Sequence, residues 1–191
     1  MQEKIISAFV SVCGLGGLGS NVAISLARAG VGKLLLIDFD RVDISNLHRQ
    51  QYFVSQLGMP KTEAMKKILG EINPYCEVIT HTVKLSDENL SLLEDSDIGC
   101  ECFDNAECKA MLVDGITQQY PDKYIVSASG MSGLHTSNII KTKKLGKRLY
   151  ICGDGKSDIQ DDKTLFAPRV MLCAAHQANA VLRIIAGEFE V

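Results

Sequence analysis

The chain has 191 residues, of which 46% are apolar and 23% are charged, and its formal net charge is −3. This length and composition are typical of one soluble globular domain, so we expect residues 1–191 to form a single domain. The slightly negative charge argues against a nucleic-acid partner. No apolar run approaches the ~18 residues that span a membrane, and no signal peptide is recognised, so we expect a cytoplasmic protein without membrane contact.

The first half of the chain alternates between short apolar runs and segments with helical spacing. Strands are predicted within 8–14, 32–40, 76–83, 96–104 and 123–130. Helices are predicted within 20–30, 60–73, 86–95 and 105–120. Such alternation predicts a Rossmann-like, doubly wound α/β fold with a mostly parallel sheet.

The second half has a different pattern. Two further strands, within 135–145 and 147–155, are joined by a turn and are expected to pair antiparallel. Residues 156–168 are polar and predict a loop. Residues 167–188 predict a closing helix that is apolar on most of its circumference, which favours a buried position or a subunit interface.

The cysteines do not form a recognisable metal or disulfide pattern. There are seven of them and no CxxC pair, so we expect neither a zinc site nor a disulfide framework. Scattered cysteines in such a chain are typically small buried side chains.

A glycine-rich segment follows the first predicted strand and opens the first long helix. Gly14, Gly16 and Gly19 have the G-x-G-x-x-G spacing, and Gly17 adds a fourth glycine. Without side chains, backbone N–H groups at a helix N-terminus can approach phosphate oxygens. Asp38 ends the second strand, 22 residues after Gly16, where a carboxylate can bind ribose hydroxyls. These features suit NAD and ATP equally well.

Polar residues beyond Asp38 favour a triphosphate over NAD. Arg49 and Lys61 could neutralise phosphate charges, Arg49 through a bidentate fork. The phosphate-binding candidates in this region are Asn46, Arg49, Gln50 and Lys61.

A metal-binding candidate lies at the end of the fourth predicted strand. Asp104, in "CFDN", is placed where sheets of this class bind ligands, and a carboxylate suits Mg²⁺. Arg41 and Lys109 are interpreted as ordinary surface charges.

Four motifs in this order resemble a known superfamily. "GLGGLGS", "DFDRVDISNLHRQQ", "GMPK" and "CFDN" resemble those of ubiquitin-activating and sulfur-carrier-activating enzymes. Within this superfamily, the segments "LYICGDG" and "APRVMLCAAHQANAVLRIIAGE" resemble those of the short ThiF-like adenylyltransferases of the thiamine pathway more than those of their molybdopterin relatives.

This resemblance implies an ATP-dependent adenylation. The C-terminal Gly-Gly carboxylate of a small ubiquitin-like sulfur carrier attacks the α-phosphate of MgATP, and sulfur then replaces AMP to give a thiocarboxylate. The resemblance also implies a homodimer. By this resemblance Gly14, Gly16 and Gly17 line the phosphate loop, and Asp38 binds the ribose with Asp40 beside it. The phosphates are bound by Asn46, Arg49, Gln50 and Lys61. Asp104 binds magnesium.

The chain departs from the family pattern in two respects. Larger relatives carry paired CxxC zinc ligands, which are absent here, so no zinc is expected. Relatives also have an N-terminal arm whose arginine reaches the partner subunit's ATP, whereas no arginine precedes Val12. The missing arginine also fits a non-catalytic nucleotide-binding relative. The motifs are further compatible with an adenylating relative that acts on a tRNA or a peptide, and the glycine spacing with an NAD-binding oxidoreductase.

A cysteine near the end of the chain has two interpretations. Some relatives use a loop cysteine for sulfur transfer, and Cys152 precedes "GDG" at the corresponding place. Cys152 is thus a sulfur-transfer candidate, and the second interpretation is a half-buried strand cysteine. The catalytic candidates are Arg49, Lys61, Asp104 and Cys152. His48 is interpreted as a solvent-facing spacer and His176 as a packed or interface histidine.

Overall fold

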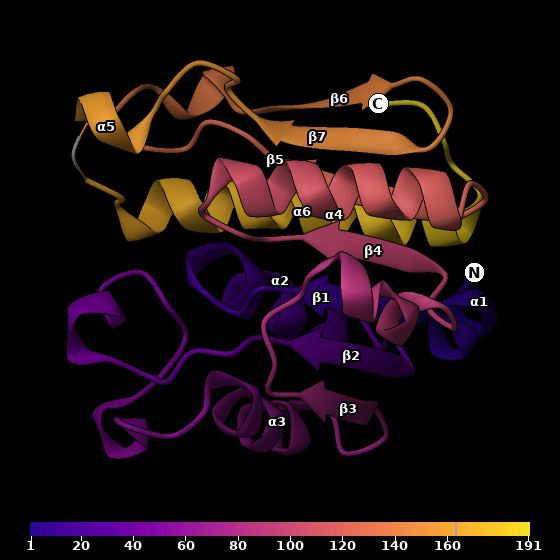
Figure 1. Ribbon diagram of the computed structural model, residues 1–191, viewed down its shortest axis with the longest axis horizontal. Helices are drawn as coiled ribbons and strands as arrows, with labels where there is room; N and C mark the ends of the chain where they lie inside the picture. Colours follow the sequence, from indigo (N-terminus) through magenta and orange to yellow (C-terminus); the bar gives the residue numbers. More distant parts are fainter. Residues whose placement is uncertain (163) are drawn as a thin grey trace.

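A computed structural model describes residues 1–162 and 164–191. Within these residues seven strands form one sheet in the order β3-β2-β1-β4-β5-β7-β6 (Figure 1). Neighbouring strands are parallel except for β6, which pairs antiparallel with β7. The strands are β1 (Phe9–Cys13), β2 (Lys33–Ile37), β3 (Glu77–His81), β4 (Ile98–Glu101), β5 (Tyr124–Ala128), β6 (Lys141–Leu145) and β7 (Leu149–Gly153).

Helices cover both faces of this sheet (Figure 1). On one face the apolar core includes side chains of α2, α3 and α6, and on the other it includes side chains of α4 and of the 3₁₀ segment Asp87–Leu93. The helices are α1 (Gln2–Ser7), α2 (Gly17–Arg28), α3 (Lys61–Ile72), α4 (Ala106–Gln119), α5 (Ile159–Asp162) and α6 (Ala167–Ala186). The prediction of a Rossmann-like, mostly parallel α/β sheet is confirmed.

The strand order reverses between β1 and β4. From β1 the chain adds β2 and β3 on one side, and it then crosses to β4 and β5 on the other side. The carboxyl ends of these strands point to one edge of the sheet (Figure 1), where residues 38–60 form loops. Ligands of open α/β sheets bind at such a reversal point, so the functional site is expected at the carboxyl ends of these strands.

Four elements differ from their predictions. The helix predicted within 86–95 is a 3₁₀ segment over Asp87–Leu93, and it is interrupted at Asn89, which has φ −126° and ψ 18°. The strand predicted within 135–145 begins only at Lys141, because the Thr136 side chain caps a 3₁₀ turn first. The predicted loop 156–168 contains α5, and its residue 163 lies outside the described part of the chain. Helix α1 was not predicted, because its six residues are too few for a clear apolar periodicity, although Ile5 packs against the core.

Helix α6 is buried along one side, as its composition predicts. Val170, Cys173, Ala174 and Val181 are no more than 1% exposed, and the helix packs against α2, β5 and β7. Met171 on its other side is half exposed. The burial of α6 within the chain is therefore partial.

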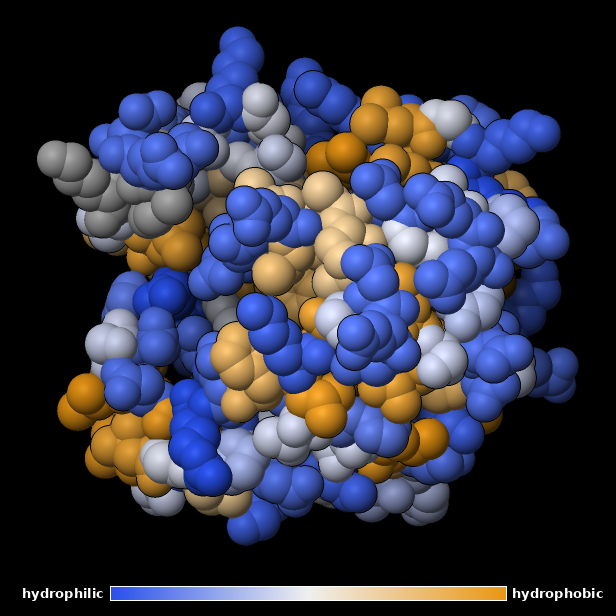
Figure 2. Space-filling view, viewed as in Figure 1, coloured by the Kyte–Doolittle hydropathy of each residue, from blue (hydrophilic) through white to orange (hydrophobic). Residues whose placement is uncertain are grey.

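Exposed apolar side chains gather in the loops that follow β2. Figure 2 shows hydrophobic residues on the lower left of the molecule, where Figure 1 places these loops. In this region more than a third of each of five large side chains is exposed: Phe39, Ile44, Phe53, Val54 and Leu57. We call this set the 39–57 patch. The structure describes no helix that is long and apolar enough to cross a membrane.

Candidate active site

The glycine segment forms a tight turn from β1 into α2. Gly14 has φ +90°, and a Cβ there would lie 3.0 Å from both the carbonyl oxygen of Cys102 and Cδ1 of Phe103. A Cβ on Gly19 would overlap the carbonyl oxygen of Gly14, so the first turn of α2 packs directly on the loop. Gly16 is the N-cap of α2 and has no side chain to accept from the first N–H groups. These donors stay available to an anionic ligand.

Asp38 lies at the end of β2 and is connected to this turn. Its Oδ2 accepts from the backbone N–H of Leu15 at 2.5 Å, and its Oδ1 accepts from the N–H of Asp40 at 2.7 Å. Burial raises the pKa of Asp38, which is 8% exposed. Each carboxylate oxygen retains a second lone pair for a ribose hydroxyl.

Lys61 is paired with a carboxylate at the start of α3. Its Nζ lies 2.8 Å from Asp40 Oδ2, and its backbone N–H donates to the carbonyl of Asp40 at 2.9 Å. The lysine side chain is 5% exposed, whereas that of Asp40 is 49% exposed. Lys61 is therefore held at the edge of the sheet, although its charge is shared with Asp40 rather than free.

Residues 46–52 pack beside the first turn of α2. Arg49 Nη2 donates to Asn46 Oδ1 at 2.8 Å, and a Cβ on Gly17 would lie 3.5 Å from Arg49 Cγ. Burial lowers the pKa of Arg49, and the charge of Asp104 opposes this shift. Asp104 thus contributes to the electrostatic environment of Arg49.

Gln50 faces the glycine turn with an unsatisfied group. Its side chain is 8% exposed, and its Nε2 lies 3.7 Å from the place that a Cβ on Gly16 would occupy. Among the described residues its buried Oε1 has no hydrogen-bond partner. A buried polar atom without a partner indicates a bound water or a ligand. Gln50 is therefore placed to contact a molecule at the turn.

Asp104 is exposed in the turn between β4 and α4. The next residue, Asn105, caps α4 by accepting from the N–H of Cys108 at 3.0 Å. No group of three or more metal-ligand side chains lies together in the described part of the chain. One exposed carboxylate is compatible with Mg²⁺, since this ion commonly takes one or two carboxylates and completes its shell with phosphate oxygens and water.

Comparison with known proteins assigns this chain to a protein family. A model of the ThiF family matches residues 1–191. The chain belongs to the ThiF family. The molybdopterin-synthase adenylyltransferase of Haemophilus influenzae is 42% identical over 113 residues, which are 58% of this chain and 46% of that protein. The adenylyltransferase and sulfurtransferase UBA4 of Candida glabrata is 36% identical over 147 residues, 76% of this chain and 34% of that protein.

Solved structures share the fold at low sequence identity. The E. coli tRNA N6-threonylcarbamoyladenosine dehydratase TcdA, in complex with ATP, superposes with a TM-score of 0.87 at 20% identity and covers 98% of this chain and 89% of its own. E. coli MccB, in complex with AMPCPP and MccA, superposes with a TM-score of 0.74 at 24% identity, and the match covers 98% of this chain and 58% of MccB. These likenesses establish the fold, and the family assignment confirms the superfamily predicted from the motifs. The ThiF-family chain spans less than half the length of the two curated relatives above.

Sequence reasoning missed a tyrosine that braces the nucleotide loop. Tyr52 is 6% exposed, and its hydroxyl donates to the carbonyl of Leu15 at 2.8 Å. Gln51 beside it donates from its backbone N–H to Ser20 Oγ and from Nε2 to Asn21 Oδ1. The motif marks these residues only as neighbours of Arg49, and their contacts with α2 depend on the tertiary fold.

Lys109 was interpreted as a surface charge, and this interpretation is wrong. Its Nζ lies 2.9 Å from Oε2 of Glu101, whose side chain is fully buried at the end of β4. The lysine also donates to the carbonyl of Ala128 on β5 at 3.1 Å. The error arises because Glu101 occurs inside an apolar strand, where sequence pattern gives no partner for it.

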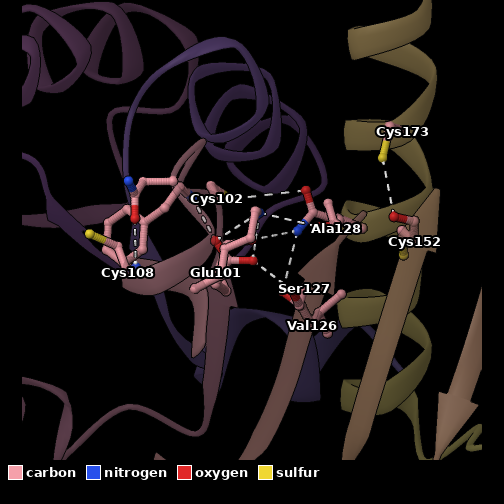
Figure 3. Close-up of polar contacts among 12 residues, drawn as sticks. Glu101, Cys102, Cys108, Val126, Ser127, Ala128, Cys152 and Cys173 are labelled. Atoms are coloured by element: carbon pink, nitrogen blue, oxygen red, sulfur yellow. Dashed lines mark hydrogen bonds and ion pairs between the residues drawn. The ribbon is translucent and has the colours of Figure 1, made fainter. Parts of the chain in front are cut away.

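Cys152 lies in β7 rather than on an exposed loop. Its side chain is fully buried, and burial raises its pKa to about 11. Cys173 of α6 donates to the carbonyl of Cys152 at 3.4 Å (Figure 3), and the Thr142 hydroxyl lies 3.6 Å from its thiol and 3.0 Å from Nδ1 of His176. A buried thiol with a raised pKa is a poor nucleophile, so this environment favours the strand-cysteine interpretation. His48, in contrast, is exposed as predicted.

Thiol reactivity tests the state of Cys152. Cys76 and Cys108 are half-buried and the other cysteines are buried, so a thiol reagent is expected to label Cys76 and Cys108 in native protein at pH 8 and Cys152 only after denaturation. Peptide mapping by mass spectrometry identifies the labelled sites. The C152A variant should keep the native labelling unchanged. Rapid native labelling of Cys152 would restore it as a sulfur-transfer candidate.

Proposed function

We propose that this protein is an ATP-dependent adenylyltransferase that activates the C-terminal Gly-Gly carboxylate of a small ubiquitin-like sulfur carrier. The observation that carries this proposal is that the glycine turn and Gln50, with its unsatisfied amide oxygen, meet at the reversal point of the sheet. The adenylyltransferases among its relatives and the ATP complex of TcdA support ATP as the nucleotide.

The proposed roles follow from these positions. The N–H groups of Gly16 and Gly17 face the phosphates, Asp38 accepts from the ribose with Asp40 beside it, and Asn46, Arg49, Gln50 and Lys61 bind phosphate oxygens. Asp104 holds Mg²⁺, which when bound neutralises charge on the leaving pyrophosphate. The attacking carboxylate is ionised at neutral pH and needs no general base. The protein therefore acts mainly by orienting the carrier carboxylate toward the α-phosphate of ATP.

The carrier is proposed to be of the thiamine-pathway type. The C-terminal segments "LYICGDG" and "APRVMLCAAHQANAVLRIIAGE" support this choice, while the curated relatives carry molybdopterin-synthase and UBA4 names. Exchange of labelled pyrophosphate into ATP measures adenylation directly. We expect Mg²⁺-dependent exchange with a thiamine-type carrier and at least tenfold less with a molybdopterin-type carrier or with a carrier that lacks its terminal glycine.

Three other outcomes of the exchange assay would each change a part of the proposed function. Equal exchange with both carriers would remove the thiamine assignment and leave the adenylation. ATP binding without exchange for any carrier would leave a non-catalytic relative. Stimulation by a tRNA or a short peptide in place of a carrier would change the substrate class.

We also propose a homodimer that buries the 39–57 patch. Phe53 and Val54 are 62% and 68% exposed, and exposed apolar side chains that gather on one surface commonly lie in an interface. Sedimentation should give twice the chain mass for the wild type and one chain mass for Phe53→Asp/Val54→Asp. Tyr75→Asp, an exposed aromatic outside the patch, is the matched control and should stay dimeric. A monomeric wild type would contradict the proposal.

A further inference from the structure

A fully buried carboxylate lies directly before the turn that carries Asp104. Glu101 is the last residue of β4 and is 0% exposed. Its Oε1 accepts from the backbone N–H of Phe103 at 2.6 Å, and its Oε2 accepts from the hydroxyl of Ser127 on β5 at 2.6 Å. Figure 3 shows Glu101 and Ser127 joined in this way across neighbouring strands. One side chain thus links the turn to the next strand of the sheet.

Lys109 connects this carboxylate to α4. It lies near the start of the helix, and its Nζ contacts Oε1 at 3.1 Å and Oε2 at 2.9 Å while donating to Ala128 on β5. The chain therefore leaves β4 at Glu101, passes through Asp104, and returns to the same carboxylate at Lys109. Both ends of the turn are fixed on one ion pair.

The turn held by this ion pair is also packed against the nucleotide loop. The place of a Cβ on Gly14 lies 3.0 Å from the carbonyl oxygen of Cys102 and from the ring of Phe103. Gln177 of α6 donates to the carbonyl of Glu101 at 3.0 Å. A movement of the turn would displace Gly14, because the Cys102 carbonyl and the Phe103 ring lie directly against it.

The Glu101–Lys109 ion pair joins a fully buried carboxylate to a lysine whose side chain is 24% exposed. Desolvation of the carboxylate offsets part of the attraction, and apolar residues of similar volume often stabilise a core as well. The Glu101–Lys109 pair lies beside the site and has both carboxylate oxygens engaged. Positioning is the role that such a directional contact performs better than an apolar one.

We propose that Glu101 and Lys109 are positioning residues that hold Asp104 in register with the glycine turn and so set the Mg²⁺ dependence of nucleotide binding. This inference rests on the proposed role of Asp104. It predicts that loss of the pair weakens the response to Mg²⁺ while metal-free nucleotide binding, which uses the glycine turn and Asp38, persists.

Calorimetric titration with ATP, in EDTA and in Mg²⁺, tests this without any carrier. Lys109→Met should reduce the Mg²⁺-induced gain in ATP affinity about 10- to 100-fold, as loss of outer-shell partners commonly does, and should keep the affinity in EDTA within about twofold. Lys109→Arg should restore most of the gain. Lys66→Met, an exposed lysine on α3, is the matched control and should behave as wild type.

The outcomes separate this inference from the proposed function. A folded Lys109→Met protein with the wild-type Mg²⁺ gain would overturn the positioning role while leaving ATP binding intact. Equal losses in EDTA and in Mg²⁺ would overturn it too, since they indicate general disruption. Should Lys109→Met fail to fold, Lys109→Gln removes the charge that pairs with Glu101 and is expected to lose the Mg²⁺-induced gain in the same two titrations; a wild-type gain in it would overturn the positioning role. A wild type that binds no ATP would instead refute the proposed function.

Discussion

Replacement of Asp104 by alanine is expected to lower the rate of carrier-dependent pyrophosphate exchange by about 10²- to 10³-fold. This is the usual cost of removing one group that stabilises charge in a transition state. Asp104 is exposed at the end of β4, interacts electrostatically with Arg49, and is the proposed protein ligand for Mg²⁺. The loss should appear in kcat more than in the affinity for metal-free ATP, because the glycine turn and Asp38 are unchanged.

A matched variant separates this effect from a general loss of charge. Asp114 is an exposed carboxylate on the helix that follows the turn, α4, and Asp114→Ala should retain the wild-type exchange rate. Retention of the full rate by Asp104→Ala would contradict both the magnesium role and the placement of the reaction at this turn. Excess Mg²⁺ should rescue Asp104→Ala only weakly.

Replacement of Arg169 by methionine is expected to lower the free energy of unfolding by about 3–5 kcal/mol, the range found when a buried ion pair loses one partner. Arg169 Nη2 lies 2.6 Å from Asp154 Oδ2, and the two side chains are 5% and 1% exposed. The guanidinium also donates to the carbonyls of His135 and Thr136. The variant would leave a buried carboxylate without its countercharge, and urea unfolding measures the cost.

The pH dependence of the Arg169 effect has a definite sign. Burial alone would raise the pKa of Asp154, but hydrogen bonds from Ser157 and Lys156 and the charge of Arg169 hold it below its ordinary value. Stability from this group is therefore full above the unfolded pKa of about 4 and is lost as the pH falls through the folded pKa. The difference between wild type and Arg169→Met should shrink in acid. Arg183→Met, on the exposed side of α6, should cost about 0.5 kcal/mol or less at any pH. An Arg169→Met protein as stable as wild type would show that the ion pair does not stabilise the fold.

The strands and long helices could be predicted from the sequence because their signals are local. "KLLLI" of β2 is apolar after its first residue, as a strand buried on both faces must be, and α6 has a continuous apolar side. The interruption of segment 87–93 at Asn89 could not be predicted, because the surrounding sequence has ordinary helical composition.

The site was predictable to the extent that its residues sit in local motifs. The glycine turn, Asp38 and the Asn46–Gln50 segment all follow the carboxyl ends of β1 and β2, as the pattern indicates. The supporting ion pairs were not predictable. Glu101 and Lys109 are eight residues apart with a turn between them, and Asp154 meets Arg169 only when α6 packs on β7. Such contacts belong to the tertiary fold.

The last strand of the sheet limits how two copies of this chain can associate. One side of β6 pairs with β7, and the other side is the open edge of the sheet. Lys141 and Lys143 are exposed on one face of this strand, and Lys144 lies over the rings of Tyr150 and Phe189. Two such edges brought together would place ammonium groups opposite one another, and like charges across a strand pair repel. The lysines of this edge strand therefore oppose growth of a continuous sheet from chain to chain.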